Sequence, residues 1–81
     1  MTLAPESPPL VETIRATRLP PPSECRAIRQ RSGATLAEVA AEVGVDPMTI
    51  SRWERGLNKP NRARAITYRH LLDALAAIGT G

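Results

Sequence analysis

Residues 35–56 read T-L-A-E-V-A-A-E-V-G-V-D-P-M-T-I-S-R-W-E-R-G, and this stretch decides the fold predicted for the chain. Thr35 and Glu38 form the T-x-x-E pattern of a capping box, in which each side chain binds the free backbone N–H of the other residue. Gly44 suits the left-handed conformation that ends many helices. A short helix is therefore predicted between Thr35 and Gly44.

A second short helix is predicted over Pro47–Arg55. Asp46 is a favoured N-cap residue, and Pro47 follows it at the first helical position, where a missing backbone N–H costs nothing. Gly56 ends this helix. The two helices are thus joined by a tight turn of only a few residues.

The apolar residues predict how the two helices cross. Ala40 is small enough for a close crossing, and Ile50 and Trp53 follow at helical spacing on the inner face of the second helix. The intervals from Ala40 to Gly44, Ile50 and Trp53 are those of a helix-turn-helix. Three valines are expected to hold the pair against the other helices: Val39, Val43 and Val45.

Two further helices are predicted around this pair. The first has Ser23 as its N-cap, runs to about Ser32 and ends at Gly33, with Cys25 and Ile28 facing the core. The last begins between Asn61 and Ala65 and ends at Gly79. Its expected core residues are Ile66, Leu71 or Leu72, Leu75 and Ile78.

Residues 1–22 form an arm that carries six of the eight prolines, and residues 23–81 form the predicted folded domain. Prolines at this density prevent a continuous helix. Between them, Leu10–Leu19 fits either a short strand or a helical turn. The arm is either disordered or docked on the domain or on a second copy.

Composition and charge narrow the possible functions. A chain of 81 residues holds one domain. Its net charge is +3, and residues 52–69 carry six cations against Glu54 alone, a net of +5 that suits a polyanion. One cysteine allows neither an internal disulfide nor a thiolate metal site. With no apolar run of membrane-spanning length and no secretory signal, the expected location is a reducing cytoplasm.

The stretch over residues 35–56 resembles the lambda-repressor/Cro-like (XRE) helix-turn-helix family, and its end, I-S-R-W-E-R-G, is especially specific. The resemblance extends over about residues 23–79. It implies an all-α, compact domain of four or five helices that inserts Pro47–Arg55 into the major groove of DNA. Members are typically transcriptional repressors or regulators, often from phage, and often bind as dimers.

Two departures from the family pattern stand out. Leu36 occupies a position where the family usually has a polar residue that touches a phosphate. The linker before the last helix is longer and richer in Arg, and no further helix follows, so the mode of dimerisation is left open.

The expected partner is a double-stranded DNA operator, with monomer and homodimer both open and with no cofactor, metal or small-molecule ligand expected. Arg52 is the best candidate for reading a base, because a guanidinium pairs with guanine O6 and N7 together. Met48 fits a thymine methyl, and Thr49 and Ser51 are short donors for bases or phosphates. The predicted DNA contacts are Thr35, Met48, Thr49, Ser51, Arg52, Arg55, Asn58, Lys59, Arg62 and Arg64.

The residues also bear on three functions other than DNA binding. One His and one Cys allow no catalytic constellation, so an enzyme is not expected. RNA binding is disfavoured by the lack of an aromatic platform. An antitoxin or adaptor that chiefly binds a protein partner stays open, because a fold does not fix a function. The alternative to base contact for Arg52 is a surface ion pair with Glu54 or Glu42.

Overall fold

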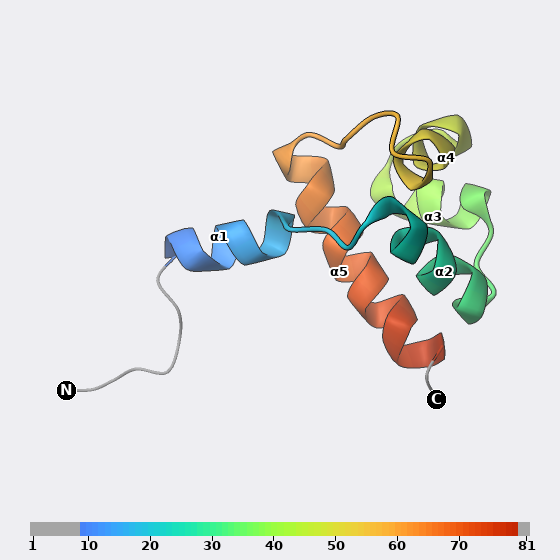
Figure 1. The fold of residues 1–81 in the computed structure, drawn as a ribbon, viewed down its shortest axis with the longest axis horizontal. Coiled ribbons are helices and arrows are strands. Elements are labelled where there is room, and N and C mark those ends of the chain that lie inside the picture. Colours follow the sequence, from blue (N-terminus) through green and yellow to red (C-terminus); the bar gives the residue numbers. More distant parts are fainter. Residues whose placement is uncertain (1–8, 80–81) are drawn as a thin grey trace.

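A computed structural model describes residues 9–79 as a bundle of five helices (Figure 1). The helices are α1 (Pro9–Thr17), α2 (Pro22–Ser32), α3 (Leu36–Val43), α4 (Pro47–Glu54) and α5 (Arg62–Gly79). No strand occurs in this part of the chain. The predicted all-α class is confirmed.

Three predicted ends of the two motif helices are confirmed, and α4 ends at Glu54, one residue before the predicted Arg55. The Thr35 hydroxyl accepts a hydrogen bond from the Glu38 N–H at 3.0 Å, and the Glu38 carboxylate accepts one from the Thr35 N–H at 2.9 Å. Gly44 ends α3 with a φ of 90°, in the left-handed region. The Asp46 carboxylate accepts a hydrogen bond from the Thr49 N–H at 3.0 Å and so caps α4.

The prediction of Ser23 as an N-cap is wrong. Helix α2 begins at Pro22, and Pro21 occupies the capping position without a side-chain hydrogen bond. The Pro21 carbonyl accepts from the N–H groups of Glu24 and Cys25 at 2.9 and 3.0 Å. Proline already has a helical φ and no N–H to satisfy, so Pro22 starts the helix without a polar cap.

The core lies where α2, α3, α4 and α5 meet. Ile50 and Trp53 are buried as predicted, and Ala40 is 1% exposed, as a close crossing of α3 and α4 requires. Cys25 is buried too, and burial raises the pKa of its thiol. Tyr68, whose burial the sequence did not indicate, is the largest of the fully buried side chains.

The expected buried face of α5 needs a correction. Its buried residues are Ala65, Tyr68 and Leu72, whereas Ile66 and Leu75 are half-buried. Ile78 is 65% exposed. It lies about 240° around the helix from Leu72, on the solvent side.

The described part of the arm is helical. Helix α1 contacts α5, while its first turn extends away from the bundle (Figure 1). Arg69 donates from Nη1 to the Arg18 carbonyl, and Leu19 packs against the core. For Leu10–Leu19 the helical alternative is thus the one found; residues 1–8 of the arm lie outside the described residues.

Candidate nucleic-acid interface

Helix α4 has an inner face that is fixed and an outer face that is open. Ile50 is 0% exposed and Trp53 is 7% exposed, so packing against the core sets the rotation of the helix. Met48 is 53% exposed on the opposite side. Arg52 and Arg55 are also exposed, whereas Thr49 and Ser51 are half-buried. The exposure that DNA contact requires is therefore found for Met48, Arg52 and Arg55, and only in part for Thr49 and Ser51.

The Asp46 cap positions the first turn of this helix. Replacing Asp46 by Ala should lower the free energy of unfolding by about 0.5–2 kcal/mol, because the Thr49 N–H loses its side-chain acceptor and keeps only the Asp46 carbonyl. Asp46→Asn retains an acceptor oxygen and should stay close to the original stability. Urea unfolding followed by circular dichroism measures both variants. Equal midpoints for the Ala and Asn variants would mean that the cap contributes nothing.

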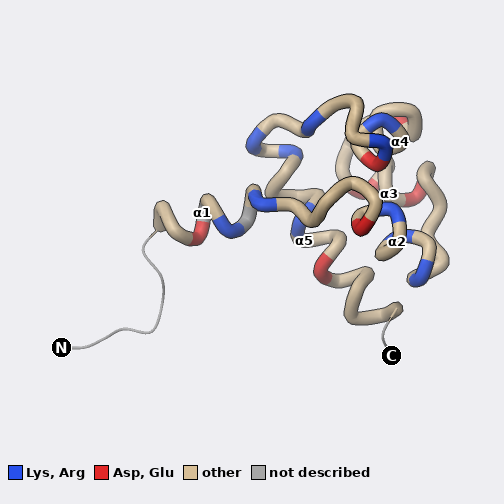
Figure 2. Tube along the Cα trace, in the orientation of Figure 1, with Lys and Arg blue, Asp and Glu red and all other residues tan. Residues whose placement is uncertain are grey.

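The loop after α4 extends the open face. The Leu57 N–H donates to the Arg52 carbonyl at 3.0 Å and turns the chain back at the end of the helix. Asn58, Lys59 and Arg62 are exposed along the following segment. Figure 2 shows Lys and Arg gathered on α4, on this loop and at the start of α5.

The distribution of ion pairs sets this face apart. Among the described residues, four Arg side chains are paired with carboxylates: Arg15 with Glu12, Arg29 with Glu54, Arg31 with Glu24 and Arg69 with Asp73. None of the predicted DNA contacts is among them. A cation without an internal counter-charge can bind an external anion without first breaking an ion pair.

Glu54 has a partner that the sequence did not reveal. Its carboxylate accepts from Arg29 Nε at 2.7 Å and from Arg29 Nη2 at 3.0 Å, and the two side chains are 12% and 4% exposed. The hydrogen bonds to Glu54 raise the pKa of Arg29. The pair joins α2 to α4 from within. Glu54 is thus not the partner of Arg52, and no periodicity in the sequence relates positions 29 and 54.

Arg64, one of the predicted contacts, is tied to the turn of the motif. Its Nη1 donates to the Val43 carbonyl at 2.7 Å, at the C-terminal end of α3. A Cβ atom at Gly44 would lie 2.5 Å from the same nitrogen. This structural role was missed in the sequence. Phosphate contact by Arg64 stays a prediction.

A shallow depression between α2 and α4 adds one residue to the candidate surface. Arg26 lines it together with Leu36, Ser51 and Arg55. Arg26 is exposed, whereas Leu36 is half-buried and packs against the core. Position 36 thus lacks a polar side chain, and Arg26 on the neighbouring helix α2 supplies a cation next to it. The sequence contained a signal for the exposure of Arg26. This residue lies two positions before Ile28 and is therefore off the buried face of α2.

Across residues 9–79, no three His, Cys, Asp or Glu side chains gather where they could hold a metal ion. Every helix in this range is too short or too polar to cross a membrane.

Comparison with known proteins gives one match. Residues 26–74 match a protein-family model described as "Helix-turn-helix". No curated protein and no solved structure matches the chain. The matched range includes α3, α4, the loop and most of α2 and α5.

Proposed function

Since the chain belongs to the XRE-type, lambda-repressor/Cro-like helix-turn-helix family and is a DNA-binding regulator of transcription, we propose that it is a sequence-specific repressor of the phage Cro type. In this proposal α4 enters the major groove of an operator, on the nucleoid or on phage DNA in a bacterial cell. The observation that carries the proposal is the open, cationic outer face of α4, whose inner face is fixed in the core.

Base reading is assigned to the outer face of α4. Arg52 is exposed and lies outside the ion pairs of the described residues, so its guanidinium is available for guanine O6 and N7. Met48, one turn earlier, offers an apolar contact for a thymine methyl. Thr49 and Ser51 are placed at the edges of this face, for bases or nearby phosphates.

Phosphate contacts are assigned to the surroundings of α4. Arg55, Asn58, Lys59 and Arg62 continue the exposed face along the loop. Thr35 and Arg64 flank the motif, and Arg26 adjoins Ser51 and Arg55 in the shallow depression. Such contacts fix the register of the protein on DNA and leave the sequence to be read by α4.

One observation favours the antitoxin or adaptor alternative. Helix α1 exposes three apolar side chains, with Leu10 66%, Val11 39% and Ile14 46% exposed. A protein partner or a second copy would cover such a helix. Selection of bound sites from random duplex DNA distinguishes these functions: a consensus supports the operator-binding function, and a two-fold symmetric one also shows a homodimer.

Arg52 and Arg62 have the same charge but different predicted roles. Arg52→Ala should cost about 1–3 kcal/mol on the selected site and relax preference at one base position. Arg62→Ala should weaken selected and point-mutated sites by the same factor and reduce the slope of log K against log salt by about one. Fluorescence anisotropy with both duplexes measures these effects.

Arg15→Ala is the matched control, since it removes one charge from α1, away from the proposed interface. The Arg15→Ala variant should keep the original affinity for the selected duplex and the original preference for it over the point-mutated duplex. If Arg52→Ala weakens the two duplexes equally, Arg52 contacts a phosphate, and the bases must be read by Met48, Thr49 and Ser51.

A further inference from the structure

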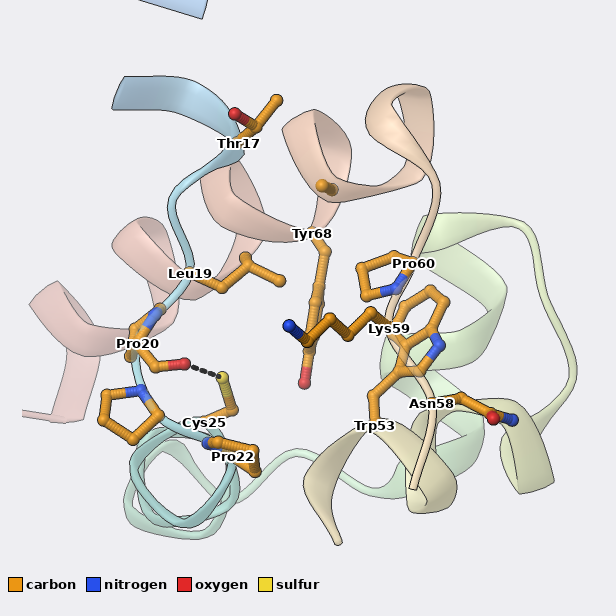
Figure 3. A pocket seen from close by; sticks show the side chains of 12 residues that line it. Thr17, Leu19, Pro20, Pro22, Cys25, Trp53, Asn58, Lys59, Pro60 and Tyr68 are labelled. Carbon is orange, nitrogen blue, oxygen red and sulfur yellow. Dashed lines mark hydrogen bonds between the residues drawn. The ribbon is translucent and has the colours of Figure 1, made fainter. Parts of the chain in front are cut away.

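A cavity of about 400 Å³ lies between the linker that joins α1 to α2 and the loop that joins α4 to α5 (Figure 3). Cavities that bind small molecules typically measure about 300–1,000 Å³ and are mostly apolar, with a few polar groups that orient the ligand. This cavity has both properties, as its walls and its two polar groups show.

The walls offer flat, rigid, apolar surfaces. On one side lie Leu19 and the run Pro20–Pro22, whose rings fix the backbone φ angles. On the other side lies Pro60, backed by the rings of Trp53 and Tyr68, which are 7% and 1% exposed and have centroids 5.1 Å apart and planes at 47°. Such surfaces favour an aromatic ring over a flexible chain.

The Tyr68 hydroxyl is the first polar group. The residue is 1% exposed, and the hydroxyl oxygen has no oxygen or nitrogen partner among the described residues. Its polar neighbour is the Cys25 thiol, a weak hydrogen-bonding group that already donates to the Pro20 carbonyl at 3.4 Å. Figure 3 shows this side chain running from α5 into the space between Cys25 and Trp53. Burial raises its pKa, so the hydroxyl keeps its proton and can donate. A buried hydroxyl whose polar neighbour is a thiol retains hydrogen-bonding capacity that a ligand would use.

Lys59 supplies the second polar group. Its side chain extends from the loop across the cavity (Figure 3). No acidic residue lines the cavity, and no ion pair within the described residues involves Lys59. A ligand with one negative charge would therefore meet a cation without a competing carboxylate.

We infer that this cavity binds a small aromatic carboxylate, with the ring between the prolines and Trp53, the carboxylate on Lys59 and a polar substituent or carboxylate oxygen on Tyr68. The linker wall, from Thr17 to Cys25, precedes the range 26–74 that matches the family. The site is thus assembled from the arm of this chain together with the shared domain.

Occupancy of the cavity would affect DNA binding. Lys59 both lines the cavity and is assigned a phosphate contact, and Trp53 lies on the inner face of α4. A carboxylate on Lys59 would neutralise that contact and weaken DNA binding. This effect on DNA rests on the proposed function, whereas ligand binding itself does not.

The binding test uses the full chain without DNA, with 2-naphthoate as the probe and neutral 2-naphthamide as its matched analogue. Isothermal titration should show saturable binding of 2-naphthoate and roughly tenfold weaker binding of 2-naphthamide, since a charge-assisted bond is lost. Backbone amide chemical shifts should move at the non-proline residues of 19–25 and 58–68. No saturable binding, equal binding of the two compounds or shifts elsewhere would overturn the inference.

Variants distinguish the two polar groups. Tyr68→Phe removes only the hydroxyl and should weaken 2-naphthoate by roughly three- to tenfold without lowering the melting temperature. Lys59→Gln should abolish the preference for 2-naphthoate over 2-naphthamide. Arg31→Gln, which removes a cation on α2 outside the cavity lining, should retain it. Unchanged affinity in Tyr68→Phe and Lys59→Gln would place the probe outside the cavity.

The effect on DNA is measured separately, on the selected duplex. 2-Naphthoate should weaken DNA binding by the original protein and leave the residual binding of Lys59→Gln unchanged. Ligand binding without any effect on DNA would overturn the coupling alone. Ligand binding by a protein that selects no DNA site would contradict the proposed function and leave the cavity assignment standing.

Discussion

Replacing Glu54 by Leu should lower the free energy of unfolding by about 3–5 kcal/mol, because Arg29 would keep a buried charge without its counter-charge. A domain of this length has about 4–12 kcal/mol of stability in total. The variant should therefore unfold at a much lower urea concentration or be largely unfolded in water. Circular dichroism at 222 nm across a urea series measures this.

A double variant and a surface control complete the experiment. Arg29→Met with Glu54→Leu removes both charges, so it should be more stable than the sum of the single effects predicts. Glu24→Leu breaks the Arg31 pair, whose side chains are 54% and 48% exposed, and should change stability by at most about 1 kcal/mol. If Glu54→Leu matches Glu24→Leu, the buried pair contributes no more than a surface pair.

DNA affinity should fall steeply as salt rises. If roughly five phosphates are neutralised, log K falls against log salt with a slope of about −4.5. Affinity for the selected duplex should then drop about 500-fold between 50 and 200 mM KCl. Fluorescence anisotropy titrations at several KCl concentrations, with one protein preparation and one duplex preparation, measure the slope.

Lys59→Gln provides the internal check on this slope. It removes one cation of the loop and should make the slope shallower by about one. Affinity that is indifferent to salt would instead favour the alternative in which binding to a protein partner dominates.

The features predicted correctly from the sequence are local ones. The capping box of Thr35 and Glu38 needs only residues three apart, and the turn at Gly44 needs only a residue that tolerates a positive φ. The inward side of Ile50 and Trp53 follows from helical spacing alone. Such features depend on residues that are close together in the sequence and can therefore be predicted from it.

The features that were missed depend on contacts between distant positions. Arg29 reaches Glu54 across 25 residues, and Arg64 reaches Val43 across 21. Tyr68 carries a hydroxyl, which gives no sign that the whole side chain is buried. The error at Ser23 had another cause, since Pro22 starts a helix without the polar cap that was sought.

For the candidate interface, the sequence predicted which side of α4 is open but not how its surroundings are arranged. The exposure of Met48, Arg52 and Arg55 follows from the period of the helix. The presence of Arg26 beside Ser51 and Arg55 depends on how α2 packs, and so does the cavity beneath Lys59. How the helices pack against one another could not be predicted from the spacing of residues within each helix.

The contact between Arg64 and the turn at Gly44 limits how the helix-turn-helix of residues 35–56 can be transferred to another protein. A chimaera that carries only residues 35–56 would leave behind both the guanidinium that satisfies the Val43 carbonyl and the Arg29 partner of Glu54. A donor segment therefore has to include α2 and the start of α5, or the recipient scaffold has to supply an Arg at each place. By the same reasoning, an alanine at position 44 would displace the Arg64 guanidinium from the Val43 carbonyl, and the positive φ would add strain of its own.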